Sequence, residues 1–374
     1  MLGRIRKILF ISFWVFCLAL SACVAPISPS IALTPTNIPA ASKELTPPAL
    51  LYIADNQLYE QQTNGTALIS NNLGEAGNVL DAVRVKDTVF VLREKGLQRI
   101  EINTGKTKMA VKFDKVPLFG ELARTSNDHV LLYSTAWESA CSSTGIGATI
   151  GLYQIDQDIS REVFVKDEGM IKPLGLTTDQ QSIYGLPLGC DPEFDRFWLI
   201  SIDQGQITKE LQTSDATNKE YGEAYAALSP DTHFLAFTTL HRTEPEDPPN
   251  YRLSIYDLNS LTIKRYELPS PSSYGDGLLW SPGSQKLYFI LNPGAPYDDS
   301  SESHGLWSLD IHTGVFSPVT GVDTRFIHLV TISTDGQWIL LQPETEPSVT
   351  YVHVPTGEQL VIKLPSEGLS KIVR

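Results

Sequence analysis

A turn motif recurs in this chain at a fixed interval. Each copy has an apolar residue, two or three small or polar turn-forming residues, and then an apolar run. The same place in successive copies is occupied by Asn127, Asp179, Asp231, Gly283 and Asp335, and each number differs from the next by 52. A repeat of this length means that each unit is one supersecondary structure, which buries its apolar face against its neighbours. The sequence therefore predicts a repeat architecture.

A second motif follows each turn: a strand-like run that ends in aspartate, a turn of Gly, Asn or Ser, and another apolar run. The aspartates are Asp156, Asp203, Asp257 and Asp310, and we expect them to accept hydrogen bonds from the turns that follow. Each unit therefore holds four short runs rich in Val, Ile, Leu, Tyr and Phe, which are typical of strands. Four strands in about 40–50 residues, repeated, are typical of a propeller blade.

The units number seven, which predicts an all-β, seven-bladed β-propeller of four-stranded blades. The first unit, residues 50–72, has room for only three strands. Residues 369–374 follow the last strand of the seventh unit, and we expect them to supply the missing innermost strand of the first blade. Closure of the ring removes exposed strand edges that invite aggregation. The six complete units begin near Val79, Leu118, Pro173, Ala224, Gly275 and Phe326.

The turns Ser-Pro-Asp, Ser-Pro-Gly and Ser-Thr-Asp-Gly, with the strands that end in Asp, carry a family resemblance. Over residues 50–374 the chain resembles the WD-repeat-like propellers of the TolB type. The resemblance implies the architecture, and it implies no particular activity, because propellers host many activities on one scaffold.

Residues 1–22 have the pattern of an export signal. Three basic residues precede an apolar run from Ile8 to Leu20, which is shorter than the roughly 20 residues of a spanning helix. The run leads into Leu-Ser-Ala-Cys, ending at Cys23, which resembles the lipobox of bacterial lipoproteins. The resemblance implies that Cys23 is lipidated and becomes the first residue of the mature protein. An ordinary signal peptide with a chance cysteine is the alternative.

We expect the anchored protein to lie on the outer side of the cytoplasmic membrane or the periplasmic side of an outer membrane. Residues 23–48 are rich in Pro, Ser and Thr and show no strand pattern, which is typical of an extended, solvated tether. The predicted propeller takes residues 49–374. The formal net charge of −14 argues against nucleic acid as a partner. We expect a monomer.

Two cysteines, Cys141 and Cys190, remain in the predicted propeller. Each follows the second strand of its blade, the two blades are consecutive, and an exported protein meets an oxidising compartment. We therefore expect a disulfide between them; two unrelated thiols are the alternative. No second cysteine pair or nearby histidine supports a zinc site, and we expect no metal and no cofactor.

Four long segments join the predicted second and third strands of the third to sixth blades. Such segments share one face of a propeller, and loops on a rigid scaffold are where repeat proteins usually bind. We expect a partner there, with simple solvation of the loops as the alternative. The acidic residues predicted for this partner face are Asp191, Glu246, Asp247, Asp298 and Asp299.

The mouth of the central channel is a second candidate site. The starts of the innermost strands converge on the axis, which places Lys172, Tyr225, Asp276 and His328 around one possible ligand pocket. A water-filled channel is the alternative.

These features favour a lipid-anchored, non-catalytic propeller that binds a protein, peptide or glycan outside the cytoplasm. The alternative is an extracellular propeller hydrolase or lyase that acts on a carbohydrate or lactone at the channel mouth, which requires convergent carboxylates or a metal. No catalytic residue is predicted. Trp280-Ser281-Pro282-Gly283 half-resembles a hydrolase motif, but it lies in the repeat register and is interpreted as a turn.

Overall fold

The computed structural model describes residues of one compact unit, Thr46–Arg374. The described ranges are 46–62, 65–71, 73–74, 76–137, 148–166, 170–188, 196–213, 220–221, 225–241, 250–269, 274–292, 305–320, 327–343, 346–365 and 369–374.

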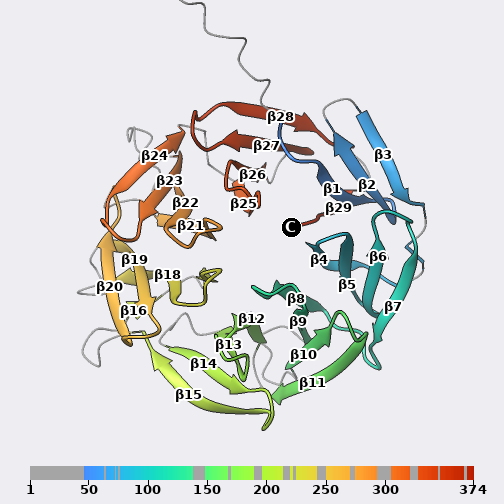
Figure 1. Ribbon diagram of the computed structural model, residues 1–374, viewed down its shortest axis with the longest axis horizontal. Helices are drawn as coiled ribbons and strands as arrows, with labels where there is room; N and C mark the ends of the chain where they lie inside the picture. Colours follow the sequence, from blue (N-terminus) through green and yellow to red (C-terminus); the bar gives the residue numbers. More distant parts are fainter. Residues whose placement is uncertain are drawn as a thin grey trace, which may run out of the picture. The chain divides into compact units, whose positions relative to one another are not determined.

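Seven antiparallel sheets stand as blades around a central axis (Figure 1), as the sequence predicts. From the axis outward, the first three blades are β29 (Leu369–Ile372), β1 (Leu50–Ala54), β2 (Gln57–Gln62) and β3 (Gly65–Ser70); β4 (Val79–Val85), β5 (Thr88–Arg93), β6 (Gly96–Glu101) and β7 (Thr107–Lys112); and β8 (Phe119–Arg124), β9 (Val130–Ala136), β10 (Ala148–Gln154) and β11 (Ile159–Lys166).

The fourth and fifth blades are β12 (Met170–Leu176), β13 (Ser182–Leu188), β14 (Arg196–Ser201) and β15 (Gln206–Gln212); and β16 (Glu220–Tyr221) with β17 (Ala226–Leu228), β18 (Phe234–His241), β19 (Asn250–Asp257) and β20 (Thr262–Glu267). The innermost position of the fifth blade is shared, because β16 and β17 both pair with β18. The last two blades are β21 (Tyr274–Trp280), β22 (Lys286–Asn292), β23 (Gly305–Asp310) and β24 (Phe316–Thr320); and β25 (Ile327–Ile332), β26 (Trp338–Pro343), β27 (Ser348–His353) and β28 (Gln359–Lys363).

The hydrophobic core lies between the blades. Seven buried clusters fill the seven gaps between neighbouring blades, one cluster to each gap. In the gap between the fourth and fifth blades, for example, Phe197 packs edge-on against Phe237, with ring centroids 5.4 Å apart. Strands such as β5 and β26 read as near-continuous apolar runs because both of their faces are covered by a neighbouring blade. Each blade is therefore stable only between two others.

The motif of 52-residue period is a five-residue turn between the first and second strands of the third to seventh blades. In the seventh blade the Asp335 Oδ1 atom accepts hydrogen bonds from the Ser333 hydroxyl (2.5 Å) and the Gln337 N–H (3.0 Å). Asp179 and Asp231 accept the equivalent pair of bonds, and Asn127 does so with its amide oxygen. The motif is structural in all of these blades.

The predicted role of the strand-ending aspartates is half right. Asp257 and Asp310 end β19 and β23, and their carboxylates accept N–H groups of the following turn. Asp156 and Asp203 instead lie two residues beyond their strands. In the fourth blade the position equivalent to Asp310 is Ser201, whose hydroxyl accepts the Gln204 N–H at 3.2 Å. Asp203 forms an ion pair with Arg161 at 3.9 Å.

The C-terminal strand closes the ring, as predicted. β29 pairs antiparallel with β1, so the first blade takes its innermost strand from the other end of the sequence. The chain then continues toward the second blade: the Arg374 N–H donates to the Ala82 carbonyl (3.2 Å), and the Arg84 N–H donates to the Arg374 carbonyl (2.7 Å). The C-terminus lies at the centre of the ring (Figure 1).

A buried carboxylate fastens this junction. The Asp81 side chain is only 4% exposed and contacts two cations of the C-terminal segment: the Lys371 amine, 3.6 Å away, and the Arg374 guanidinium. It also accepts the Leu122 N–H from the third blade at 2.8 Å, and Arg374 donates to the Leu122 carbonyl at 3.0 Å. One carboxylate thus joins the first, second and third blades.

Within the described residues, every regular element is a strand, and no helix has the length and apolar character needed to cross a membrane.

Removing the Asp81 carboxylate should destabilise the closed ring. Asp81→Ala leaves the Leu122 N–H and two cations without their buried partner, and breaking a buried ion pair costs about 3–5 kcal/mol. Because Lys371 and Arg374 are each more than one-third exposed, we expect a loss of about 3 kcal/mol, measured by urea unfolding. Asp87→Ala, at an exposed carboxylate of the next turn, is the control and should change stability by less than about 0.5 kcal/mol. Equal effects of the two variants would contradict the role of Asp81.

Candidate functional site

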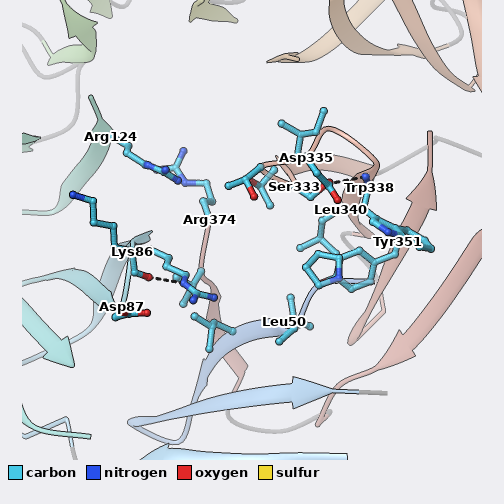
Figure 2. Close-up of a pocket in the computed structure, with 18 of the residues that line it drawn as sticks. Leu50, Lys86, Asp87, Arg124, Ser333, Asp335, Trp338, Leu340, Tyr351 and Arg374 are labelled. Carbon is cyan, nitrogen blue, oxygen red and sulfur yellow. Dashed lines mark hydrogen bonds between the residues drawn. The ribbon is translucent and has the colours of Figure 1, made fainter. Parts of the chain in front are cut away.

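A hollow of about 570 Å³ opens on the face of the ring that carries the turns between first and second strands. We call it the turn-face hollow. It is lined by residues of the seventh, first, second and third blades and by the two ends of the described unit (Figure 2). The lining residues are Thr46, Pro48, Ala49, Leu50, Leu51, Arg84, Lys86, Asp87, Arg124, Asp128, Thr331, Ile332, Ser333, Thr334, Asp335, Trp338, Leu340, Tyr351, Val373 and Arg374.

The hollow forms where the repeat is interrupted. In the first blade no turn joins the first and second strands, β29 and β1, because they come from opposite ends of the described unit. In the second blade the five-residue turn is replaced by the two-residue turn Lys86–Asp87, in which Lys86 has positive φ, as tight hairpins of strongly twisted strands require. One turn is missing and the next is three residues shorter than the others, so less chain covers this part of the face.

Elsewhere on the same face, neighbouring turns touch. The Asn127 amide donates to the Gln180 side chain (3.1 Å), and the Asp231 N–H donates to the Ser284 hydroxyl (3.1 Å). The hydroxyls of Thr178 and Thr232 are 2.8 Å apart. These contacts link the third to the sixth blades in series, and a Cβ atom added at Gly336 of the seventh blade would lie 3.2 Å from the Pro282 ring of the sixth. The hollow occupies the remaining arc, from the seventh blade round to the third.

The floor of the hollow is apolar and rigid. Leu50, Leu340, Trp338 and Tyr351 belong to the buried cluster between the seventh and first blades. The Trp338 ring packs edge-on against Tyr351, with centroids 6.2 Å apart. The backbone N–H of Trp338 donates to the Ser333 hydroxyl at 2.9 Å. The turn that forms one rim is therefore fixed directly to the floor.

The basic side chains gather on one side of the hollow. Figure 2 shows Lys86, Arg124 and Arg374 on that side, together with Asp87, and Ser333 and Asp335 on the other. We define the basic wall as Arg84, Lys86, Arg124 and Arg374, all of which line the hollow.

The members of the basic wall are held to different degrees. The Arg374 guanidinium is bound to Asp81, as described above. Arg124 forms a forked ion pair with Asp128, with Nε–Oδ1 and Nη2–Oδ2 distances of 2.8 and 3.3 Å. The Arg84 Nε donates to the Lys86 carbonyl at 2.8 Å. Neither the terminal nitrogens of Arg84 nor the Lys86 amine has a hydrogen bond or ion pair with another described residue.

Asp335, the acidic residue on the rim, accepts hydrogen bonds within its own turn. The hydrogen bond from the Ser333 hydroxyl, followed by that from the Gln337 N–H, lowers the pKa of the Asp335 carboxyl below its ordinary value. The same arrangement lowers the pKa of Asp179, through the Thr177 hydroxyl and then the Gln181 N–H. The turn therefore keeps the Asp335 carboxyl ionised to a lower pH than an ordinary aspartate, and the same holds for Asp179 in a blade that lies away from the hollow.

The residues predicted for the channel mouth lie elsewhere. Lys172 belongs to β12, and its amine is 3.3 Å from a Glu121 carboxylate oxygen of β8 in the neighbouring blade. His328 is exposed near the start of β25, Tyr225 immediately precedes β17, and Asp276 lies in β21. None of Lys172, Tyr225, Asp276 and His328 is among the described residues that line the turn-face hollow. A common ligand pocket for these four stays a prediction.

Several predicted residues lie outside the described ranges. They are Cys23, Cys141, Cys190, Asp191, Glu246, Asp247, Asp298 and Asp299. Lipidation, the disulfide and the acidic partner face therefore stay predictions. Within the described ranges, no group of three or more His, Cys, Asp or Glu side chains is arranged to hold a metal ion.

Sequence reasoning missed the turn-face hollow. The available signal was an absence: the Ser-Pro-Asp type of turn occurs in the third to seventh units and not in the first two. A two-residue turn in the second unit, next to a first unit whose innermost strand comes from the other end of the chain, predicts a gap on that face, although it does not predict which side chains line it.

No protein-family model matches the sequence, and no curated protein matches it. Solved structures do match. An oligogalacturonate lyase from Vibrio parahaemolyticus matches with a TM-score of 0.59 at 12% identity, covering 84% of this chain and 85% of the lyase chain. The hydrazine synthase of Kuenenia stuttgartiensis gives 0.53 at 14% identity, with 75% and 78% covered. The β-propeller domain of Cps50 (Swd1) from Myceliophteria thermophila gives 0.53 at 12%, with 79% and 89% covered.

The shared feature is the propeller fold. These likenesses confirm the propeller part of the resemblance seen in the sequence. At such low identity, and with three proteins named for such different roles, they show the fold and leave the function to the site.

The turn aspartates should make the propeller sensitive to acid. The folded pKa values of Asp179 and Asp335 lie below the unfolded value of about 3.9, so these two carboxylates contribute stability above that pH, and the contribution is lost as pH falls through the folded pKa. Asn127 shows that an amide oxygen accepts the same two bonds. We therefore expect Asp179→Asn with Asp335→Asn to keep the turns and to reduce the fall in melting temperature between pH 6 and about pH 3.

The matched control is Asp114→Asn, at an exposed residue. It should leave the pH dependence as in the wild type. If the double variant and the control lose melting temperature equally with acid, the turn aspartates are not the source of the sensitivity.

Proposed function

We propose that this protein is a lipid-anchored, extracytoplasmic propeller that works as a non-catalytic binding module for a protein, peptide or glycan. The observation that carries the proposal is the turn-face hollow. Its volume of about 570 Å³ lies in the range of roughly 300–1,000 Å³ that is common for ligand sites.

The build of the hollow supports a binding role. Its floor belongs to a buried cluster, and Arg374 of its basic wall is fastened by Asp81, so little conformational freedom of these parts remains to be lost when a ligand binds. It also coincides with the part of the ring that departs from the repeat. In repeat proteins, local departures in loops usually lie on the binding face.

The anchor is proposed from the sequence. Residues 1–22 have the pattern of an export signal, and Cys23 follows the lipobox-like Leu-Ser-Ala. The chain enters the propeller beside the hollow, because Thr46, Pro48 and Ala49 form part of its wall.

The enzyme alternative keeps one point of support, since a solved protein with this fold is named as an oligogalacturonate lyase. We include it as an arm of the test. Cleavage of oligogalacturonate, or of another acidic oligosaccharide, by the purified chain would favour a hydrolase or lyase over a binding module.

Lipidation at Cys23 should hold the protein in the membrane fraction. In the native host, Cys23→Ala should either release the protein from membranes or leave it with its signal uncleaved. Mass spectrometry of the wild-type protein should find a lipid-modified cysteine as the first residue. Ser21→Ala, which preserves a small residue before the cysteine, is the control and should be processed like the wild type. An unmodified N-terminus at another residue would refute the anchor.

The partner-binding face can be located by paired substitutions. Thr334→Trp fills the turn-face hollow from its rim, whereas Ser126→Trp places the same side chain at the equivalent, exposed position of the third blade, outside the lining. We expect partners cross-linked in intact envelopes to be lost with Thr334→Trp and retained with Ser126→Trp.

The acidic partner face predicted from the sequence is tested in parallel. Replacing Asp298-Asp299 and Glu246-Asp247 by serine should weaken partner binding if the predicted loop face is the binding surface, and it should leave the melting temperature nearly unchanged. Loss of partners in neither set of variants would contradict the binding proposal.

A further inference from the structure

We infer that the basic wall of the turn-face hollow binds an oxyanion group of the ligand, a carboxylate, phosphate or sulfate. This inference rests on the proposed function, because it names the ligand chemistry of the same hollow. It goes further in assigning the recognition to three side chains, Arg84, Lys86 and Arg124.

These three cations come from separate pieces of the fold and meet at one place. Arg84 lies near the end of β4, Lys86 lies in the turn that follows, and Arg124 ends β8 of the next blade. Grouping like charges disfavours folding by mutual repulsion. A group of this kind is expected where an anion is bound.

Two of the three have donors to spare. Arg84 uses only its Nε atom, in the bond to the Lys86 carbonyl, and this bond fixes the direction of the guanidinium. Its two terminal nitrogens and the Lys86 amine have no partner among the described residues. A guanidinium fork binds a carboxylate or phosphate through two parallel hydrogen bonds, and an ammonium adds a compact charge.

Arg124 can be recruited at small cost. It is paired with Asp128, but the two side chains are 43% and 22% exposed, and a partly exposed pair of this kind contributes only about 0–1 kcal/mol. Arg374 differs, because the buried Asp81 holds its guanidinium. Arg374 therefore stays paired with Asp81 and is not one of the groups assigned to bind the anion.

The surrounding charge makes this wall distinctive. The chain has a net charge of −14, so an anion is repelled by the protein as a whole. On the rim itself, Asp335 stands on the opposite side of the hollow from the basic wall (Figure 2), and its Oδ1 atom is occupied by the turn. Two carboxylates lie on the basic side, Asp87 next to Lys86 and Asp128 paired with Arg124, and the three cations Arg84, Lys86 and Arg124 outnumber them. We therefore expect the anionic group of a ligand to bind on the side of the second and third blades. The rest of the ligand then lies over the apolar floor.

The test uses calorimetric titration of the full-length protein in non-ionic detergent, with pyrophosphate and citrate as probes at constant ionic strength set by sodium chloride. We expect saturable binding of at least one probe. Arg84→Gln with Lys86→Gln should weaken it by about tenfold, as expected when hydrogen bonds to a charged group are lost. Lys286→Gln removes an exposed lysine on the same face, outside the lining, and should bind like the wild type.

The two probes separate the sources of the anion, since preference for pyrophosphate indicates a phosphate-bearing ligand and preference for citrate a carboxylate-bearing one. Lys86→Gln alone serves if the double variant fails to fold. No binding of either probe, or equal affinity in the wild type and the Lys86→Gln variant, would overturn the inference. If the inference fails in this way but Thr334→Trp still abolishes partner binding, the proposed binding function stands without the anion site. If the probes bind and Thr334→Trp has no effect on partners, the anion site stands and the proposed binding function of the hollow fails.

Discussion

The structure depends on the closure of the ring by residues that are far apart in the sequence. Each of the seven buried clusters lies between two blades, so an open ring would expose the apolar faces of its first and last blades. The pairing of β29 with β1 and the contacts of Asp81 with Lys371 and Arg374 supply this closure. A buried carboxylate is costly to desolvate alone, and here two cations and two N–H groups compensate it.

Closure and the candidate site share the same residues. Val373 and Arg374 line the turn-face hollow while their backbones bond to the first and second blades. A ligand in the hollow therefore contacts an arrangement that exists only in the closed ring. By mass action, such a ligand stabilises the closed state in proportion to its concentration above its dissociation constant. Binding and ring stability are coupled here, whereas the acidic loops predicted as a partner face carry no residue of the closing strand.

Much of the fold was predictable because the repeat carries its own physical signature. The five-residue turns needed a hydroxyl and an aspartate at fixed spacing, and the sequence shows both. The strand-end turns were less regular: Ser201 replaces aspartate in the fourth blade, which shifted the expected position to Asp203. The hollow was not predictable, because it arises from a turn three residues shorter in the second blade, from the meeting of the two chain ends in the first, and from the packing of distant segments. No local sequence motif around Arg84 or Arg374 predicts that these two residues line the same hollow.

The two kinds of departure from the repeat have different physical meanings. Replacing Asp by Asn or Ser in a turn, as at Asn127 or Ser201, preserves an oxygen acceptor and leaves the blade geometry intact. Shortening a turn removes chain and opens the face, as in the second blade. The first kind keeps the structural requirement of the turn, an oxygen acceptor. The second changes what the surface presents, and it does so beside a basic wall whose Arg84 and Lys86 donors are not used by the fold. Function in this propeller is therefore sought where the repeat is shortened, and not where its turn residues vary.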